Sequence, residues 1–423
     1  MAELGYDVVG MDIDAEKISQ LSSGVVPFFE PGLQELLQAN LANGRLRFTT
    51  SFEQVAAHGD VHFICVGTPQ KAGEYAADLS YVNGAVAGLL PYLTRECLVV
   101  GKSTVPAGTA ARLDAWIAAE APAGRDNGGG IELAWNPEFL REGFGVEDTI
   151  HPDRLVFGVA SEAAEAKLRA AYEPVIASGT PVVVTDFATA ELVKVSANAF
   201  LATKISFINA MAEVCEATHA DVKKLSEALS HDNRIGGRFL HAGLGFGGGC
   251  LPKDIRAFMA RAGELGVDQA LSFLREVDAI NLRRRDRTVD LAREMLDGSL
   301  RGRRVGVLGA AFKPNSDDIR DSPALDVAVR MRRQGADVTL YDPEATDNAR
   351  KKEPDLSYAD SAVEAVRGAD VVLHLTEWQE FRTMDPNTLA DVVSQRKIVD
   401  GRNALDPVQW RAAGWQYRAL GRP

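Results

Sequence analysis

The sequence predicts an α/β protein with a doubly wound domain at each end and a long helix between them. Short apolar strands alternate with polar segments of helix length, a rhythm typical of parallel sheets covered by helices. Three strand patterns recur in the same order in both halves of the chain. The stretch between the halves has helical rather than strand periodicity. We therefore expect three regions, residues 1–185, 186–300 and 301–423.

The repeated strand patterns are the strongest evidence for two similar domains. The pattern at 5–12, a glycine followed by a buried strand that ends in an acid, returns at 335–342. The pattern at 59–66 returns at 369–375, and the one at 98–103 returns at 397–402. Because the order is kept, the sequence predicts two Rossmann-like, doubly wound domains.

The central stretch predicts long helices. Thr185 and Asp186 can cap a helix that runs to about Thr218, longer than the roughly 11–12 residues of a mean helix. Its apolar positions recur at helical spacing and are Leu192, Val195, Phe200, Leu201, Ile205, Ile208 and Met211. A second helical pattern begins near Gln269 and continues towards Leu296. Long helices that join two domains often present a face for pairing, so we expect a homodimer.

Composition narrows the class of protein. The chain has 423 residues, of which 46% are hydrophobic, and a formal net charge of −13. This acidity argues against nucleic acid as a general partner, and no apolar run is long enough for a membrane span. The four cysteines are scattered, without metal-ligand spacing. We expect a reduced, cytoplasmic protein without a metal site.

Comparison of the two halves indicates a missing segment. The second half begins with a strand at 304–309, a loop, and a helix that ends at 331–335, whereas the first half begins at 1–5 with what reads as that helix's last turn. We expect that about 20–30 residues carrying strand one, its turn and most of its helix are absent. That turn usually carries G-x-G-x-x-G, so we expect the chain as written to bind a dinucleotide poorly. A degenerate domain unable to hold a cofactor is the alternative.

The segment 234–254 carries the most specific chemical signal. Seven glycines precede Cys250 and permit tight turns and a close approach of the backbone to a ligand. Pro252 fits the first position of a helix, which places Cys250 at that helix's N-terminal end. The helix dipole and Lys253 there favour a thiolate, so we predict that Cys250 is a nucleophile. The other three cysteines are expected to be small buried hydrophobic residues, namely Cys65, Cys97 and Cys215.

This segment resembles the UDP-glucose/GDP-mannose dehydrogenase family, whose signature is a glycine loop ending in G-G-x-C-x-P-K-D. Its upstream part, from Arg234-Ile235-Gly236 to Phe239-Leu240, is most similar to members that act on UDP-glucose. Further matching blocks cover nearly the whole chain and lie at 30–33, 67–69, 103–106, 136–143, 191–198, 312–314 and 400–403. Gly249 is a departure, because the family often has serine at that position.

The resemblance implies a four-electron oxidation with NAD through a covalent cysteine intermediate. Lys194 and Asn198, four residues apart on one helix face, would stabilise an oxyanion, and Lys194 is a candidate for taking the first proton. Asp254 and Thr104 would hold the hydrolytic water. Glu138 and Glu142 would be the acid/base and cofactor-side carboxylates, and which residue has which role stays open. Together with Cys250, the implied catalytic residues are therefore Lys194, Asn198, Asp254, Glu138 and Thr104.

The binding residues follow from the same resemblance. Those implied for NAD are Asp12, Lys17, Thr68, Thr104, Glu142 and Arg320. Asp12 ends a strand, where an acid can bind the adenosine ribose hydroxyls. Those implied for UDP-glucose are Phe139, Leu140, Arg141, Lys194, Arg234, Phe239, Gly247, Lys313 and Arg402. The two cations Lys313 and Arg402 suit a diphosphate.

Three alternatives remain open at this point. A related dehydrogenase would act on GDP-mannose or a UDP-N-acetylhexosamine. A two-electron hydroxyacid dehydrogenase would share the fold but has no need of Cys250. From another class, the chain would be an inactive remnant that dimerises or binds a nucleotide sugar.

Overall fold

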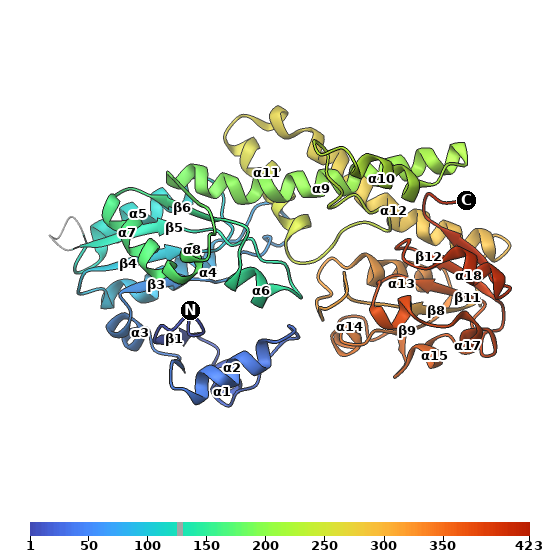
Figure 1. Ribbon diagram of the computed structural model, residues 1–423, viewed down its shortest axis with the longest axis horizontal. Helices are drawn as coiled ribbons and strands as arrows, with labels where there is room; N and C mark the ends of the chain where they lie inside the picture. Colours follow the sequence, from blue (N-terminus) through green and yellow to red (C-terminus); the bar gives the residue numbers. More distant parts are fainter. Residues whose placement is uncertain (125–129) are drawn as a thin grey trace. The chain divides into compact units, whose positions relative to one another are not determined.

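The computed structural model describes residues 1–124 and 130–423, and these form two compact units. Unit 1 comprises residues 1–197 and 256–266, and unit 2 comprises residues 198–255 and 267–423. The chain passes between the units three times, inside the helices α9 (Phe187–Thr218) and α11 (Leu251–Glu264) and again after α11, between Gly266 and Val267. Both helices are labelled in Figure 1.

Unit 1 contains a small parallel sheet and a larger mixed sheet. A two-stranded sheet pairs β1 (Val8–Met11) with β2 (Leu46–Thr49). A five-stranded sheet has the order β3-β4-β5-β6-β7, in which only the β5–β6 pair is antiparallel. Its strands are β3 (Val61–Ile64), β4 (Cys97–Gly101), β5 (Ile131–Trp135), β6 (Leu155–Val159) and β7 (Val182–Thr185). Within the described residues, neither β1 nor β2 pairs with a strand of the five-stranded sheet.

Helices cover both faces of the five-stranded sheet. One core cluster includes Val99, Leu113 and Trp135, and the other includes Val100, Phe157 and Leu168, so alternate residues of β4 point to opposite faces. The helices of unit 1 before α9 are α1 (Ala15–Ser22), α2 (Leu33–Ala42), α3 (Phe52–His58), α4 (Ser80–Leu89), η1 (Leu90–Tyr92), α5 (Thr109–Glu120), α6 (Gly145–Ile150), α7 (Glu162–Ala171) and α8 (Glu173–Ala177).

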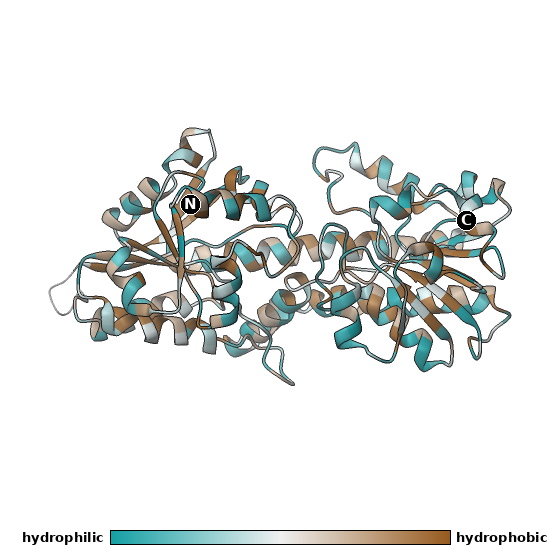
Figure 2. Ribbon diagram, turned by 90° about the horizontal axis from the view of Figure 1, so that it is seen from below, coloured by the Kyte–Doolittle hydropathy of each residue, from teal (hydrophilic) through white to brown (hydrophobic). Residues whose placement is uncertain are grey.

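Unit 2 contains a complete six-stranded parallel sheet in the order β10-β9-β8-β11-β12-β13, coloured orange to red in Figure 1. Numbered from its first strand, this order is 3-2-1-4-5-6, the doubly wound dinucleotide-fold arrangement. The strands are β8 (Arg304–Leu308), β9 (Asp337–Tyr341), β10 (Ser357–Tyr358), β11 (Val371–His374), β12 (Lys397–Asp400) and β13 (Gln416–Ala419). In Figure 2 these strands are mostly hydrophobic, whereas the covering helices carry hydrophilic residues.

Eight further helices and one 3₁₀ turn are described in unit 2, besides parts of α9 and α11. They are α10 (Val222–Ser230), η3 (Asp268–Leu271), α12 (Phe273–Met295), α13 (Pro323–Arg333), α14 (Thr346–Lys352), α15 (Ala362–Ala365), α16 (Gln379–Arg382), α17 (Pro386–Ala390) and α18 (Pro407–Ala412). The largest core cluster of the unit packs α12 and α13 against the sheet through residues such as Val289, Met331 and Val307.

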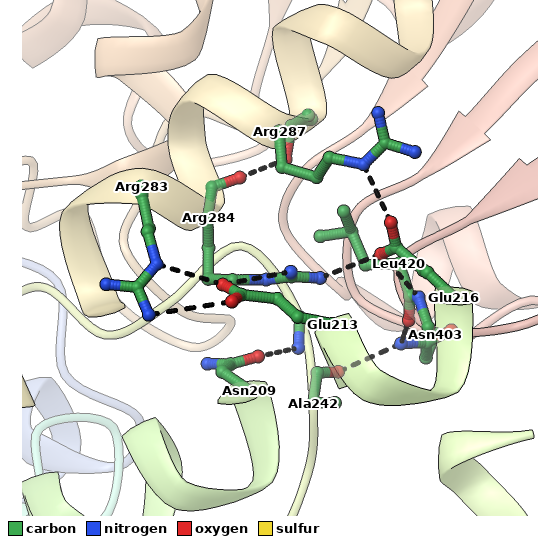
Figure 3. A network of polar contacts seen from close by, with 12 residues as sticks. Asn209, Glu213, Glu216, Ala242, Arg283, Arg284, Arg287, Asn403 and Leu420 are labelled. Atoms are coloured by element: carbon green, nitrogen blue, oxygen red, sulfur yellow. Dashed lines mark hydrogen bonds and ion pairs between the residues drawn. The ribbon is translucent and has the colours of Figure 1, made fainter. Parts of the chain in front are cut away.

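Charged residues fasten α9 to α12 in unit 2 (Figure 3). Arg284 is fully buried, and its guanidinium lies 3.2 Å from a carboxylate oxygen of Glu216 and 3.6 Å from one of Glu213. Arg283 pairs with Glu213 at 3.2 Å and Arg287 with Glu216 at 2.7 Å. A buried arginine is tolerated only where carboxylates compensate its charge, so this network fixes which face of α9 meets α12.

The predicted fold class is confirmed, and so are its main elements. The helix α9 ends at Thr218 as predicted, and the Asp186 carboxylate accepts a hydrogen bond from the backbone N–H of Thr189 at 2.8 Å. Residues 1–5 form a turn that ends at Gly5, whose φ of 100° is the left-handed conformation of a helix C-cap. Pro252 is the second rather than the first residue of α11, which still leaves Cys250 directly before the helix.

One prediction about cysteine was wrong. Cys97 and Cys215 are buried as expected, but Cys65 is exposed. Cys65 follows the last residue of β3, at the edge of the five-stranded sheet, where no neighbouring strand among the described residues covers it. Apolar patterning identified the strand but not its position at an edge.

Candidate functional site

Cys250 lies directly before α11 in unit 2, and three polar residues surround the helix start. The backbone N–H of Asp254 donates to the carbonyl oxygen of Cys250 at 3.0 Å, which closes the first turn. The Asp254 carboxylate is buried, accepts a hydrogen bond from Nδ2 of Asn198 at 2.6 Å and pairs with the ammonium of Lys253. The fold thus brings three predicted catalytic residues of unit 2, Cys250, Asn198 and Asp254, into one connected group.

The glycines before Cys250 are required by close packing. A Cβ atom on Gly247 would lie 2.3 Å from the carbonyl oxygen of Asp321, and one on Gly248 would lie 2.7 Å from the ring of Phe312. The N–H of Gly248 donates to the carbonyl oxygen of Arg320 at 2.9 Å. The loop is therefore held against the segment 312–321, and larger residues at 247 and 248 would displace it.

Gly249, where the family often has serine, lies beside Arg320. A Cβ atom there would come within 2.4 Å of the guanidinium carbon of Arg320. That guanidinium also pairs with Asp318 at 2.7 Å. Glycine at 249 therefore leaves room for Arg320 next to the backbone that leads into Cys250, and a serine would require the arginine side chain to move.

Arg402 and Lys313 occupy different environments. The Arg402 guanidinium is largely buried and donates to the carbonyl oxygens of Leu375, Gly245 and Phe312 at 2.8, 3.1 and 2.8 Å. Burial lowers the pKa of Arg402 below its ordinary value, and the carboxylate of Glu377 at 3.3 Å opposes this shift. Lys313 is partly exposed, with its ammonium 5.3 Å from the ring centre of Phe312.

Asp400 holds the strand end that leads into Arg402. Its fully buried carboxylate accepts hydrogen bonds from the backbone N–H groups of Arg402 and Leu405, at 3.0 and 2.9 Å. It is also bonded to Nδ1 of His374 and to the hydroxyl of Tyr417, each at 2.9 Å. Burial opposes the charge, but these bonds outweigh it and hold the pKa of Asp400 below its usual range.

Two other predicted substrate residues lie on the preceding loop. Arg234 is 90% exposed in its side chain and pairs with Asp232 at 2.7 Å. Phe239 is half-buried and has a φ of 64°, a strained conformation for a residue with a Cβ.

The predicted residues of unit 1 meet at Lys194. Its ammonium is buried, 2.9 Å from a carboxylate oxygen of Glu138 and 5.6 Å from the ring centre of Phe139. The other carboxylate oxygen of Glu138 accepts the backbone N–H of Leu140 at 2.6 Å. Lys194 and Asn198 lie one turn apart on α9, so their side chains share one face of that helix.

The loop that follows Glu138 carries the other predicted residues. Arg141 pairs with Asp148 at 2.6 Å, and Leu140 is 42% exposed. Glu142 is partly buried. Sequence reasoning assigned no role to Glu30, whose carboxylate accepts the backbone N–H groups of Gly143 and Gly145 at 2.8 and 2.7 Å. In the sequence, the one indication of a role for Glu30 was its place in the family-matching block 30–33.

Of the residues predicted for NAD, Asp12, Thr68 and Thr104 lie on the segments of unit 1 that follow β1, β3 and β4. Asp12 directly follows β1, and its carboxylate is 2.7 Å from the ammonium of Lys17. Burial opposes its charge, but bonds from Lys17 and the N–H of Asp14 outweigh it and hold the pKa of Asp12 below its ordinary value. Thr68 is buried, and its hydroxyl donates to the carbonyl oxygen of Thr104 at 2.7 Å.

An ionised, partly exposed carboxylate at a strand end fits a ribose diol, which offers two hydroxyl donors. The donor set of Asp12 and Lys17 is therefore suited to the adenosine end of NAD. Within residues 1–124 and 130–423, no three His, Cys, Asp or Glu side chains are grouped so that they could hold a metal ion. The same residues include no helix with the length and apolar character needed to cross a membrane.

Comparisons with known proteins place these features in a family. Three domain models of the UDP-glucose/GDP-mannose dehydrogenase family match in order along the chain. They are the NAD binding domain at residues 1–176, the central domain at 188–283 and the UDP binding domain at 306–407. The chain belongs to the UDP-glucose/GDP-mannose dehydrogenase family. It is thus an NAD-dependent dehydrogenase. The match to the family's NAD binding domain confirms the predicted cofactor, NAD.

Similar members of the family cover this chain from end to end. A UDP-glucose 6-dehydrogenase of Rhizobium meliloti is 41% identical over 424 residues, which is 100% of this chain and 95% of the relative. The UDP-glucose 6-dehydrogenase YwqF of Bacillus subtilis is 38% identical, over 100% of this chain and 94% of the relative. The structure of a UDP-glucose dehydrogenase from Pyrobaculum islandicum matches with a TM-score of 0.90 at 38% identity, covering 100% of this chain and 94% of that chain.

Proposed function

We propose that this dehydrogenase oxidises UDP-glucose to UDP-glucuronate through a covalent intermediate on Cys250. The observation that carries the proposal is the group at the start of α11, where the backbone of Cys250 is bonded to Asp254 and the Asp254 carboxylate is bonded to Asn198. A dehydrogenase that stops at an aldehyde or ketone has no use for a nucleophile. The overall reaction converts UDP-glucose, two NAD⁺ and water into UDP-glucuronate, two NADH and three protons.

Cys250 divides this oxidation into easier steps. After the first oxidation, C6 of the glucose is an aldehyde carbon. The Cys250 thiolate attacks it, a C–S bond forms, and the carbonyl electron pair moves to oxygen to give a thiohemiacetal. The second oxidation turns this adduct into a thioester. The N-terminal end of α11 favours the thiolate, because its free N–H groups stabilise negative charge.

Lys194 and Asn198 are proposed to stabilise the negative oxygen on C6. The buried ammonium of Lys194 supplies a full positive charge, and the Asn198 amide retains a second N–H besides the one it gives to Asp254. Donors placed in advance towards a developing oxyanion are worth several kcal/mol. Glu138, whose carboxylate lies 2.9 Å from this ammonium, is the proposed acceptor of the proton that leaves the C6 hydroxyl, because an ammonium group has no lone pair to accept it.

Asp254 is proposed to direct the final hydrolysis, with Thr104 as the second contact of the water. A water that loses a proton to the carboxylate attacks the thioester carbon, the C–S bond breaks, and Cys250 leaves as a thiolate. UDP-glucuronate is released and the thiol group is ready for another cycle. Asp254 is suited to this task because its carboxylate is buried and oriented by Asn198.

Cofactor binding is assigned to Asp12, Lys17, Thr68, Glu142 and Arg320. When bound, NAD takes up the hydride at each of the two oxidations. Asp12 would accept the adenosine ribose hydroxyls, and Arg320 would exchange Asp318 for the pyrophosphate, since a guanidinium binds either anion through paired hydrogen bonds.

The UDP moiety is assigned to Lys313, Arg402, Gly247, Phe239 and the exposed Arg234. Arg402 also acts through its three carbonyl bonds, which hold the glycine loop near Gly245 to the segment that carries Lys313. The 139–141 backbone, next to Lys194 and Glu138, is proposed to contact the substrate as well.

A UDP-N-acetylhexosamine is the second candidate substrate. The structure of a UDP-D-ManNAc dehydrogenase from Pyrococcus horikoshii matches with a TM-score of 0.86 at 28% identity, over 100% of this chain and 95% of that chain. The identities of 38–41% with UDP-glucose enzymes favour UDP-glucose over this candidate.

The experiment that tests the function counts NADH formed per sugar consumed for a panel of nucleotide sugars. We expect turnover of UDP-glucose with two NADH per molecule and weaker activity on GDP-mannose and UDP-N-acetylhexosamines. One NADH per sugar, or preference for another sugar, would overturn the proposal.

We also propose that the protein acts as a homodimer in the cytoplasm. The outer side of α9 exposes Phe200, Phe207 and Val214, which recur every seven residues. This spacing makes one continuous apolar seam on a helix, and a second copy of the same helix can cover it by two-fold symmetry. No disulfide joins the four cysteines, all of which lie within the described residues, and this is the usual state of cysteines in a reducing compartment.

A further inference from the structure

Glu30 joins two segments of unit 1 that are far apart in the sequence. It lies between α1 and α2, on the same part of the chain as Asp12 and Lys17, whereas its hydrogen-bond partners lie just before and at the start of α6. One carboxylate oxygen accepts the N–H of Gly143 at 2.8 Å, and the other accepts the N–H of Gly145 at 2.7 Å. Glu30 is only partly exposed.

The contact is specific to a carboxylate. Both Glu30 oxygens face N–H donors, and hydrogen bonds to an ionised acceptor are stronger than neutral ones. A Cβ atom on Gly145 would lie 3.4 Å from the carboxyl carbon of Glu30, so the side chain packs closely against the loop backbone. Gly143 has a φ of 77°, a left-handed conformation that lets the chain turn at this point.

The same loop is fastened at its other end by the Lys194–Glu138 pair. Glu138 holds the N–H of Leu140, and Glu30 holds those of Gly143 and Gly145. Between them, the carboxylate of Asp148 accepts the N–H of Arg141 at 2.8 Å. The backbone of the stretch 139–142 is thus held at several points, and Glu30 supplies the two bonds at its C-terminal end. Loss of the Glu30 bonds would therefore release the C-terminal end of the stretch, while Glu138 and Asp148 still hold Leu140 and Arg141.

We propose that Glu30 is a positioning residue for the substrate, which acts by holding the 139–142 backbone in the conformation that binds the nucleotide sugar. The inference rests on the proposed function, because it takes the 139–141 backbone as a substrate contact. Glu30 itself touches neither the sugar nor the reacting atoms. Its role extends the substrate site to the segment that also carries the proposed ribose-binding residues Asp12 and Lys17.

The substitution Glu30→Gln tests the inference with little change in shape. The glutamine amide keeps one oxygen acceptor but turns an NH₂ group towards an N–H donor, so one of the two bonds is lost. Glu30→Asp is a second variant, which keeps the charge but is too short to reach both N–H groups. Glu35→Gln is the matched control, since Glu35 is exposed on the neighbouring α2.

Two measurements on the full chain distinguish positioning from general destabilisation. Calorimetry with UDP-glucose should show binding weakened about tenfold or more in Glu30→Gln and Glu30→Asp, as loss of one charge-assisted bond implies. Hydrogen–deuterium exchange should rise within 139–145 in both variants and stay unchanged in the sheets. Glu35→Gln should match the parent protein in both measurements.

The outcomes separate this inference from the proposed function. If the parent protein fails to bind UDP-glucose, the proposed substrate is wrong. If it binds and both Glu30 variants bind equally tightly, or if exchange within 139–145 is unchanged, Glu30 is not a positioning residue. If exchange rises throughout both sheets as well, Glu30 contributes to general stability and the inference is overturned.

Discussion

Lys194 is the buried cation around which the predicted catalytic residues of unit 1 are arranged. A buried ammonium group is costly unless it is paired, and the carboxylate of Glu138 at 2.9 Å provides that compensation. Glu138 remains 26% exposed in its side chain, so it can be solvated if the lysine is removed. The pair thus allows the role of the cation to be tested without leaving a dry, unpaired charge.

Replacing Lys194 with methionine should lower kcat at least about a hundredfold, because it removes the positive charge proposed to stabilise the C6 oxyanion. The affinity for UDP should change little. Steady-state kinetics with UDP-glucose, together with calorimetry with UDP, checks both expectations. Lys223→Met on the exposed surface of α10 is the control and should leave kcat unchanged. A Lys194→Met variant with full kcat would exclude Lys194 from the chemistry.

Residue identities could be predicted where a local pattern carried them. Cys250 was identifiable because the glycines, Pro252 and the cysteine lie in one short segment. Glu30 had no such pattern, since its partners Gly143 and Gly145 are 113 and 115 residues away. Nor could sequence reveal that the Arg402 guanidinium binds carbonyl oxygens of three different loops. Contacts of this kind appear only when the tertiary fold brings the segments together.

At the scale of elements, β3 shows what an unusual sheet edge does to a buried side chain. His62 is 8% exposed and its Nε2 atom has no hydrogen-bond partner in the described structure. Burial, aided by the nearby charge of Arg95, lowers the pKa of His62 to about 4. The fold therefore favours the neutral form of His62, and protonation of this side chain destabilises the folded state.

The free energy of unfolding should decrease as the pH is lowered, because of His62. In the unfolded chain a histidine binds its proton near pH 6.5, whereas in the fold His62 does so only near pH 4. The contribution to stability is complete above pH 6.5 and is lost as the pH falls to 4, by roughly 3 kcal/mol. Denaturant unfolding across this range should show a shallower dependence on pH for His62→Gln than for the parent protein. The exposed His231→Gln is the control, and an equal slope in His62→Gln would contradict the assignment.

The sequence predicted elements better than their pairing. Strand cores and the end of α9 followed from apolar periodicity and capping. The antiparallel pairing of β5 with β6, and the division of unit 1 into two sheets, did not, because periodicity reports which residues are buried and not which strand lies alongside.

At the scale of the whole molecule, α9 has two contrasting faces. One face carries Glu213 and Glu216, which bind the arginines of α12 (Figure 3). The other exposes Phe200, Phe207 and Val214, with exposed fractions of 66%, 48% and 53%. Large apolar side chains on the outer face of a long helix are the expected signature of an interface with a second copy.

If the protein forms the proposed dimer, the substitution Phe207→Glu should convert it into a monomer, because two-fold symmetry places the new charge in the seam of both copies. Light scattering coupled to size-exclusion chromatography gives the mass directly. Val408→Glu, at an exposed apolar position on α18, should remain dimeric. A Phe207→Glu protein that is still dimeric would move the interface away from this seam.

The covalent role of Cys250 is tested most directly by mass spectrometry of the enzyme quenched during turnover of UDP-glucose. The proposed covalent mechanism predicts an adduct of the nucleotide sugar on the peptide that contains Cys250, and none on the peptides of Cys65, Cys97 or Cys215. Prior alkylation of Cys250 should abolish both the adduct and acid formation. No adduct at Cys250, with UDP-glucuronate still produced by the alkylated enzyme, would contradict it.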